Sequence, residues 1–506
     1  MTTASQIRDY VVCRHRVTMD AFGNPADRDK PNSFVEMLWE NGIEHEAAMV
    51  ASLGITADMS TVSLADRERE TRAAMARGEP QIYRGRLTVA GLVGEPDLLE
   101  NRGGGYIAGD IKSGGGLEGE DEDGGKGRIK KDYAYQVAHY ENILQKIGLS
   151  DGSRESFIID RDALRVPYPL MEPQGARTPQ TWWDGYLAVL AEVEALLAKS
   201  KTSKPAMAAP CKLCHWYSAC RRDLIAAADL TLVCELGRTK RDVMCVALPT
   251  IHALATCDPN EFVRAKKTDF AGVGPDSLRT YHARAKLLVT PGAKPYIRGP
   301  IRLPIMAKEC FFDVEDDPVR GSFLYLCGFV ERLHGRPETA VFLPQFADGF
   351  DAASEKEVFR RSWAYLLERS VDSAIYYYSK YERTTLRRMA QRYPSVCTVE
   401  QVNDLFGLPN VIDLYTDVVN KTEWPTYDKS IKTLAKYLGF SWRDSHPSGA
   451  ASIQWFHEWT EKRDPAVKAR ILEYNHDDCL ATGIVVDGIR TVIERCQPGL
   501  AGRNPA

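Results

Sequence analysis

Residues 310–317 read CFFDVEDD. The apolar start is typical of a core strand, and Asp313 and Glu315 stand two positions apart within it. Side chains two apart on a strand project from the same face of the sheet. The stretch therefore predicts a strand that presents two carboxylates side by side.

The sequence that follows alternates between strand-like and helix-like segments. SFLYLCGFVER and TAVFLPQFAD read as strands, and a helix, the strand SAIYYY, the helical ERTTLRRMAQRY and the strand VIDLY come after them. The final segment, KARILEYNHDDCLATGIVVDGIRTVI, is helical and sets Tyr474 and Asp478 one turn apart. Three meandering strands followed by alternating strand and helix is the order of an RNase H-like α/β domain.

These residues resemble the DEDD exonucleases, in the subgroup whose final motif is Y-x-x-x-D. Asp313 and Glu315 match the D-x-E motif, and Tyr474 to Asp478 match the final one. The resemblance implies two-metal hydrolysis, in which Asp313 bridges two Mg²⁺ or Mn²⁺ ions and Tyr474 positions the attacking water. Glu315, Glu382 and Asp478 would complete the metal shell. The alternative is a set of surface acids with a core tyrosine.

The third motif of this family is the one that departs from the pattern. YSKYE, residues 378–382, stands where the family has N-x-x-F-D, so Glu382 replaces the usual aspartate. Asp413, in VIDLY, is the alternative ligand. Asp317 and Asp477 are expected to be solvated neighbours of the site.

A second pair of carboxylates occurs in the strand-like region 82–114. The runs LVGEPDLLE and YIAGDIKSG flank NRGGG, a good hairpin turn, which sets Asp97 roughly opposite Asp110. Lys112 is two positions after Asp110 and projects from the same face. A divalent cation accounts for two facing carboxylates that would otherwise repel each other.

Helical segments flank these strands. In SFVEMLWENGIEHEAAM, His45 falls on the inward stripe, and in DYAYQVAHYENIL, Gln136 and Tyr140 are four apart on one face. A satisfied core histidine is the alternative for His45 alone. Taken in order, His45, GEPD, DIK and QVAHY resemble the RecB-type branch of the PD-(D/E)xK nucleases, which have a restriction-endonuclease-like fold.

This second resemblance implies a further metal-dependent nuclease site. The implied ligands of Mg²⁺ or Mn²⁺ are His45, Asp97 and Asp110. Lys112 would orient or activate the attacking water, and Gln136 and Tyr140 would steady the active site or the DNA strand. The segment GGGLEGEDEDGGKGRIKKD, residues 114–132, departs from the family pattern and is expected to be a mobile loop.

Residues 211–220 read CKLCHWYSAC and bring Cys211, Cys214 and Cys220 close together in the chain. The iron–sulfur branch of the RecB-type nucleases has three cysteines after the nuclease core and one before it, and Cys13 stands in that early position. The resemblance implies a 4Fe–4S cluster that closes a very long loop. There are two alternatives. The three thiols could bind zinc together with His15 or His215, or the cysteines could simply be core residues.

The segment between the two nuclease-like regions contains FAGVGPDSLRTYHARAKLLV. GVG before an amphipathic helix resembles helix–hairpin–helix modules, in which main-chain N–H groups contact a phosphate. Gly272 and Gly274 would make these DNA contacts, with support from nearby basic residues that include Arg284. A helical connector whose glycines permit tight packing is the alternative.

The composition and the expected domain boundaries give the last predictions from the sequence. The chain has 506 residues, 44% of them apolar, a net charge of −4, no secretory leader and no apolar run of membrane-spanning length, which predicts a cytoplasmic protein. The expected divisions are 1–228, 229–298 and 299–506. The whole resembles fused RecB-family nucleases acting on single-stranded or flapped DNA in repair, recombination or defence, possibly with a helicase partner. An iron–sulfur DNA-binding scaffold with inactive sites and a 3′–5′ RNA exonuclease are the alternatives.

Overall fold

A computed structural model describes residues 1–31, 33–119, 127–175, 178–445 and 447–497. The chain forms two compact units. The first comprises Met1–Pro205 and Ala209–Arg222, and the second comprises Ala206–Ala208 and Asp223–Ala506. The expected middle module, 229–298, therefore falls within the second unit, and its boundaries stay a prediction. Among the described residues, no helix is both long and apolar enough to cross a membrane.

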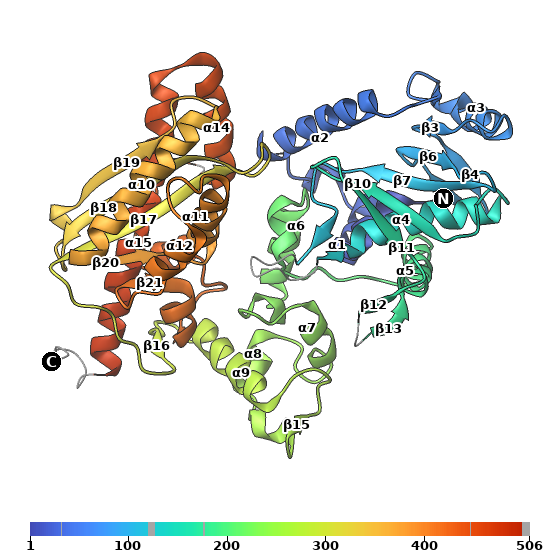
Figure 1. Ribbon diagram of the computed structural model, residues 1–506. Coiled ribbons are helices and arrows are strands. Elements are labelled where there is room, and N and C mark those ends of the chain that lie inside the picture. The colour runs from blue at the N-terminus through green and yellow to red at the C-terminus, as the bar shows by residue number, and fades with distance from the viewer. Residues whose placement is uncertain (32, 120–126, 176–177, 446, 498–506) are drawn as a thin grey trace. The chain divides into compact units, whose positions relative to one another are not determined.

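The first unit is built on a six-stranded mixed sheet (Figure 1). Its strand order is β11 (Arg165–Pro169), β10 (Glu155–Ile159), β7 (Tyr106–Ile111), β6 (Leu98–Asn101), β3 (Gln81–Tyr83) and β2 (Ala57–Asp58). β6 and β7 are antiparallel and pair Leu98 with Gly109, whereas β10 runs parallel to β7. The hairpin expected between GEPD and GDIK is therefore present.

Helices cover both faces of this sheet. The helices of the unit are α1 (Ala4–Phe22), α2 (Ser33–Ser52), α3 (Leu64–Ala76), α4 (Lys131–Lys146), α5 (Trp182–Leu197) and α6 (Tyr217–Ala226), which ends in the second unit. α1, α4 and α5 share one core with Leu99, Tyr106 and Ala108 of the sheet. Met49 and Val50 of α2 pack against the opposite face, on Ile107 and its neighbours.

Short strands complete the unit. They are β1 (Thr2–Thr3), β4 (Leu87–Val89), β5 (Leu92–Gly94), β8 (Leu117–Glu118), β9 (Arg128–Ile129), β12 (Pro173–Gly175) and β13 (Thr178–Thr181). β8 and β9 pair antiparallel within the segment expected to be a mobile loop, so the described residues at its two ends form paired strands. The rest of that expectation, residues 120–126, lies outside the described residues.

A five-stranded sheet forms the centre of the second unit (Figure 1). Its order is β19 (Val341–Phe346), β18 (Phe323–Leu333), β17 (Lys308–Asp317), β20 (Ser373–Tyr377) and β21 (Val411–Asp413). The first three strands are antiparallel neighbours, and β20 and β21 run parallel to β17. This is the meander-then-crossover order that the sequence predicts.

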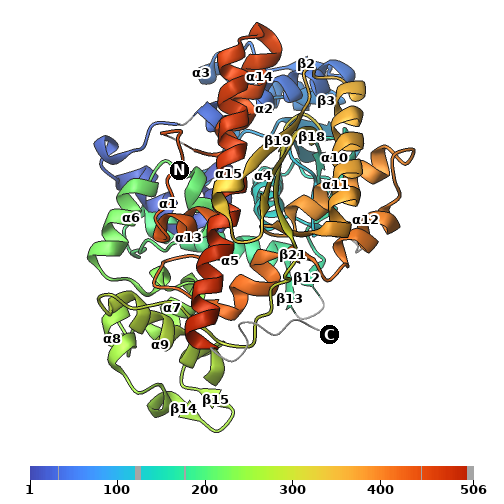
Figure 2. The same cartoon turned by 90° about the vertical axis from the view of Figure 1, so that its left-hand side faces the viewer.

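Two long helices lie on opposite faces of this sheet, α10 (Ala352–Asp372) and α15 (Pro465–Cys496) (Figure 2). Tyr365 of α10 packs on Phe329 of β18, with ring centroids 4.6 Å apart. Gly483 of α15 lies against Phe311 of β17 on the other face. Because side chains alternate along β17, Asp313 and Glu315 share the α15 face with Phe311.

The remaining elements of the second unit are mostly helical. They are α7 (Arg238–Met244), α8 (Ile251–Thr256), β14 (Val263–Arg264), β15 (Lys267–Thr268), α9 (Pro275–Val289), β16 (Tyr296–Ile297), α11 (Tyr381–Arg392), α12 (Val399–Phe406), β22 (Thr422–Glu423), α13 (Ile431–Tyr437) and α14 (Gly449–Lys462). α7, α8 and α9 share a small apolar core of their own. β16 pairs antiparallel with β22 and joins this helical part to the sheet domain.

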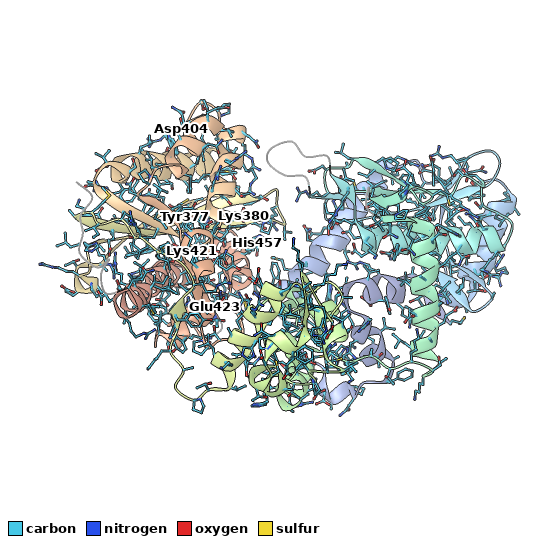
Figure 3. The ribbon with its side chains drawn as sticks, turned by 90° about the horizontal axis from the view of Figure 1, so that it is seen from below. Tyr377, Lys380, Asp404, Lys421, Glu423 and His457 are labelled. Carbon is cyan, nitrogen blue, oxygen red and sulfur yellow. The ribbon has the colours of Figure 1, made fainter. Side chains whose placement is uncertain are left out.

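A buried ion pair also joins the helical part to the sheet domain. The Arg284 guanidinium of α9 donates to the Glu423 carboxylate at 2.9 and 3.1 Å, and both residues are buried. Figure 3 shows Glu423 beside the helices of this part. The prediction that Arg284 is available to contact DNA was wrong, because its charge is used inside the fold.

Candidate active sites

Three carboxylates converge on the α15 face of the second unit. Asp313 and Glu315 come from β17, and Asp478 comes from α15, which crosses beneath that strand. One oxygen from each lies within 4.8 Å of the other two, and they form the one such group of three ligand-bearing side chains among the described residues. An oxygen-only set of this kind suits Mg²⁺ or Mn²⁺. The residues therefore fit the divalent ion that the D-x-E and Y-x-x-x-D spacings imply.

Each of these carboxylates accepts a hydrogen bond from a neighbouring side chain. Asn475 Nδ2 donates to Asp313 at 2.8 Å, Trp442 Nε1 donates to Asp478 at 2.7 Å, and the Tyr325 hydroxyl donates to Glu315 at 3.3 Å. These partners were not identified from the sequence. Asn475 follows the motif tyrosine directly, which was the one available signal, whereas Trp442 and Tyr325 carry none.

Burial and mutual repulsion dominate the electrostatics of this cluster. Burial, followed by the Asp478 and Glu315 charges, raises the pKa of Asp313 well above its usual range. The pKa values of Glu315 and Asp478 are also raised, first by burial. The Lys432 ammonium opposes the shift in all three carboxyl groups. A bound divalent cation would supply far more of the positive charge that the site lacks.

Tyr474 lies between the cluster and Lys432. The Lys432 Nζ donates to the Tyr474 hydroxyl at 3.1 Å and to the Pro447 carbonyl at 2.7 Å. Burial, the negative cluster and a hydrogen bond to Asp478 raise the pKa of Tyr474 well above 10, so the phenol stays protonated. Lys432, on α13, was missed because nothing in its local sequence links it to Tyr474, which lies 42 residues downstream.

Glu382 lies at the start of α11, near the cluster but outside its tightest group. It is buried, and its Oε2 has no hydrogen-bond partner among the described residues. Burial raises its pKa to about 8, and the charges of Asp413 and Asp478 contribute. The Asp413 carboxylate instead caps the turn after β21, where it accepts from the Thr416 N–H and hydroxyl groups at 2.9 and 2.8 Å. Glu382 is thus the better placed of the two as a further ligand.

The prediction that Asp317 and Asp477 are solvated was wrong, since both are buried. Asp317 Oδ2 pairs with His457 Nε2 of α14 at 2.5 Å. Asp477 Oδ1 accepts from Arg443 Nε at 2.8 Å. Both aspartates therefore hold the surrounding elements in place.

The first unit brings Asp97, Asp110 and Lys112 together at the end of the β6–β7 hairpin. The Asp97 N–H donates to Asp110 Oδ1 at 3.3 Å, and Lys112 Nζ donates to Asp110 Oδ2 at 2.8 Å. Burial and the Asp110 charge raise the pKa of Asp97 to about 8. The Ile111 N–H donates to Asp97 at 2.8 Å and holds this carboxylate in place.

The other predicted members of this site lie on flanking helices. Gln136 Nε2 donates to the Tyr140 hydroxyl at 3.2 Å, and both residues are buried. His45 does not form a comparably tight group with Asp97 and Asp110 among the described residues. Its Nε2 atom is buried without a partner among the residues described. Glu46, which sequence reasoning missed, accepts from Tyr83 and Arg84, and its charge raises the pKa of Asp97.

The cysteine segment packs against the end of α1. Trp216 Nε1 and His215 Nε2 contact Asp20 at 2.9 and 2.6 Å, which fastens residues 211–220 to the helix that carries Cys13. Cys13 itself has extended backbone angles, φ −159° and ψ 105°, inside α1. Burial raises the pKa of Cys214, and Cys13 and Cys211 lie close enough for their charges to add to the shift. Among the described residues the cysteines do not form a ligand group as tight as the acidic cluster, so a metal group shared by Cys13, Cys211, Cys214 and Cys220 stays a prediction.

The predicted phosphate-binding glycines precede α9. Gly272 has φ +74°, a left-handed conformation that favours glycine, and Gly274 is the residue that caps α9. A Cβ at either position would meet open space. The requirement for glycine at 272 is therefore conformational, and DNA contact by this turn stays a prediction.

Comparison with known proteins supports one part of this picture. Residues 310–489 match a family model described as the RNase_H superfamily. The match spans the sheet of the second unit and every member of its acidic cluster. No curated protein matches the chain. The second unit therefore contains an RNase H-like domain, whose superfamily indicates a metal-dependent nuclease type of function.

Proposed function

We propose that the protein is a metal-dependent DNA nuclease that trims single-stranded ends or flaps in DNA repair, recombination or defence. The observation that carries the proposal is the Asp313, Glu315 and Asp478 cluster within an RNase H-like domain. Phosphodiester hydrolysis needs charge stabilisation at the attacking and leaving oxygens, which two ions held by such a cluster supply. Glu382 would complete the ligand set.

The chain's own residues would align the reactants around that centre. The Tyr474 hydroxyl accepts a hydrogen bond from Lys432 at 3.1 Å, which restrains its orientation beside Asp478. A phenol held in this way would orient the attacking water toward the scissile phosphate. Because its pKa is raised, Tyr474 would position the water through a hydrogen bond and would not act as the base.

The first unit would contribute a second, RecB-like nuclease site. Asp97 and Asp110 would hold Mg²⁺ or Mn²⁺ with His45, whose buried Nε2 lacks a partner among the described residues. Lys112 would orient the attacking water, and Gln136 and Tyr140 would steady the active site or the DNA strand. A 4Fe–4S cluster held by the four cysteines would fasten the two ends of this unit together. These ligands would be Cys13, Cys211, Cys214 and Cys220.

DNA is the substrate and partner that this proposal names, and the Gly272–Gly274 turn would contact its backbone. Unwinding would come from a helicase partner, because no G-x-x-x-x-G-K-[ST] motif occurs in the sequence. A cytoplasmic location is part of the same proposal.

The test compares wild type with Lys112→Ala, Asp478→Asn and the double variant on end-labelled DNA and RNA of one sequence, with Mn²⁺ or EDTA. Asp162→Asn, an exposed aspartate, is the control. We expect each single variant to lose one cleavage pattern and the double variant to lose all cleavage. Full cleavage by the double variant would refute both sites. Cleavage of RNA alone would identify an RNA exonuclease, and wild type without cleavage would favour a DNA-binding scaffold.

A further inference from the structure

Asn475 lies inside the second unit, at the contact between α15 and the central strands. Its side chain is fully buried, and its Nδ2 donates to Asp313 Oδ2 at 2.8 Å. A buried amide without a partner is costly, so this hydrogen bond favours one arrangement of the two side chains. Asp313 is the predicted bridging ligand, whose orientation sets where both ions would sit.

The chemistry of the contact decides which end of the amide faces Asp313. An Asp313 that binds a metal ion is ionised, and an ionised carboxylate only accepts hydrogen bonds, so the amide must present its N–H group to it. The Asn475 Oδ1 then points away from Asp313 and has no partner among the described residues. The amide therefore contributes a donor to the site and adds no further negative charge.

Gly328 makes the space in which this amide lies. On β18 it pairs directly with Asp313 of β17, so a side chain at 328 would project from the same face. A Cβ at this position would lie 1.6 Å from Asn475 Oδ1 and 3.0 Å from the Phe342 ring. Alanine at 328 thus requires Asn475 to move. The backbone conformation is not the reason for glycine, since Gly328 lacks a positive φ.

We infer that Asn475 is a positioning residue for Asp313, and that Gly328 is required because it leaves the slot in which Asn475 lies. The inference rests on the proposed metal-dependent function of this site. Residues next to metal ligands that fix their orientation typically contribute about 10- to 100-fold to metal affinity or activity. The slot determines how well the site holds its ions, without touching the substrate.

The experiment measures Mn²⁺ binding directly, by thermal shift over a Mn²⁺ titration of the full chain, alongside kcat and KM. Four proteins are compared, namely wild type, Asn475→Ala, Gly328→Ala and the double variant. Asn410→Ala is the matched control, because the Asn410 amide also donates two hydrogen bonds, to the Ser370 and Ser373 carbonyls, away from the cluster. All are measured in the Asp110→Asn background, which removes a proposed metal ligand of the first unit, so that this unit neither cuts nor contributes to the Mn²⁺ titration.

We expect Asn475→Ala and Gly328→Ala each to raise the apparent Kd for Mn²⁺ and to lower kcat about 10- to 100-fold, with KM for DNA unchanged. The double variant should resemble Asn475→Ala alone, because the clash that Gly328→Ala creates is with Asn475. Asn410→Ala should lower the Tm and leave the Kd for Mn²⁺ unchanged.

The outcomes separate the inference from the proposed function. If wild type shows a Mn²⁺-dependent shift that Asp478→Asn abolishes, while Asn475→Ala binds Mn²⁺ like wild type, the positioning role is wrong. If the losses of Mn²⁺ affinity and kcat in the double variant equal the sum of those in the two single variants, Gly328 acts through the sheet. The inference that Gly328 leaves space for Asn475 would then be wrong. If wild type shows no Mn²⁺-dependent shift, the proposed metal site itself fails.

Discussion

Glu382, beside the acidic cluster of the second unit, has a charge state that affects the stability of the fold. Its pKa rises from 4.5 to about 8 in the folded protein because burial penalises the charged form. In metal-free protein the folded state therefore binds more protons than the unfolded state between these values, and stability falls as pH rises through them. Below pH 4.5 Glu382 is protonated in both states, and its stabilising contribution to the folded state is fully present. Above pH 8 Glu382 is ionised in both states, and this contribution is lost.

We predict that Glu382→Gln removes this dependence. At pH 7 the substitution should raise the free energy of unfolding by up to about 3 kcal/mol, since each pKa unit corresponds to about 1.4 kcal/mol. Denaturant unfolding in EDTA at pH 4.5, 7 and 8.5 measures the difference. If the free energy of unfolding changes with pH equally in wild type and Glu382→Gln, the raised pKa of Glu382 is wrong. Excess Mn²⁺ should stabilise wild type more than Glu382→Gln, because the variant lacks one carboxylate of the proposed ligand set.

Lys432 gives a second prediction at this scale. Lys432→Met removes the donor to Tyr474 and a positive charge beside three carboxylates, so kcat should fall at least about tenfold, or 1.4 kcal/mol. Lys436→Met, on the exposed side of the same helix, is the control and should keep wild-type kcat. Both are assayed at saturating Mn²⁺ in the Lys112→Ala background. Equal kcat values for the two variants would show that Lys432 is dispensable.

At the level of single residues, local spacing predicted the members of motifs and nothing beyond them. Asp313, Glu315, Tyr474 and Asp478 follow from two short patterns, and the structure places all four together. Lys432 could not be found in this way, because α13 meets α15 only in the folded chain. A lysine in an ordinary helix carries no sign of the distant carboxylates that it will face.

Among the elements, α1 has a break within it that needs a cause. The helix contains neither proline nor glycine, yet Cys13 has extended backbone angles within it. Sharp helix breaks usually have an identifiable chemical reason. The residue at the break, Cys13, is the predicted early ligand of the iron–sulfur cluster, and this role stays a prediction.

We predict that anaerobically purified protein contains iron and acid-labile sulfide, and that Cys13→Ser loses both. The first unit should then unfold at a lower temperature, because a ligand that joins distant segments is removed. Cys496→Ser is the control, since this cysteine is exposed at the end of α15. Zinc without sulfide in wild type would contradict the iron–sulfur assignment and favour the zinc alternative.

Strand and helix order was predictable in the sheet of the second unit, because β18, β19 and β20 are largely apolar runs. The ladder of β17 with β18 and β20 follows the expected meander and crossover. Buried charges were harder to predict. Asp317 looks like part of an acidic surface run in EDD, but His457, from a helix far along the chain, covers it. Burial of this kind depends on long-range packing that a local window does not contain.

At the scale of the whole molecule, one buried carboxylate joins parts of the second unit that are far apart in the sequence. Glu423 is 1% exposed and pairs with three cations, Arg284 of the helical part, Arg298 and Lys429. Arg284 and Lys429 are themselves buried. Removing one partner of a buried ion pair leaves the others uncompensated, which typically costs about 3–5 kcal/mol.

We therefore predict that Glu423→Gln lowers the free energy of unfolding of the second unit by about 3–5 kcal/mol. Hydrogen exchange should show residues 251–289 losing protection before β17 and β18 do, because Arg284 is the buried charge that links this helical part to the sheet domain. Glu357→Gln, which removes an exposed ion pair with Arg360 and Arg361, is the control and should change stability little. Unchanged stability in Glu423→Gln would mean that the apolar core of α7, α8 and α9, together with the β16–β22 pairing, holds the helical part in place without this charge.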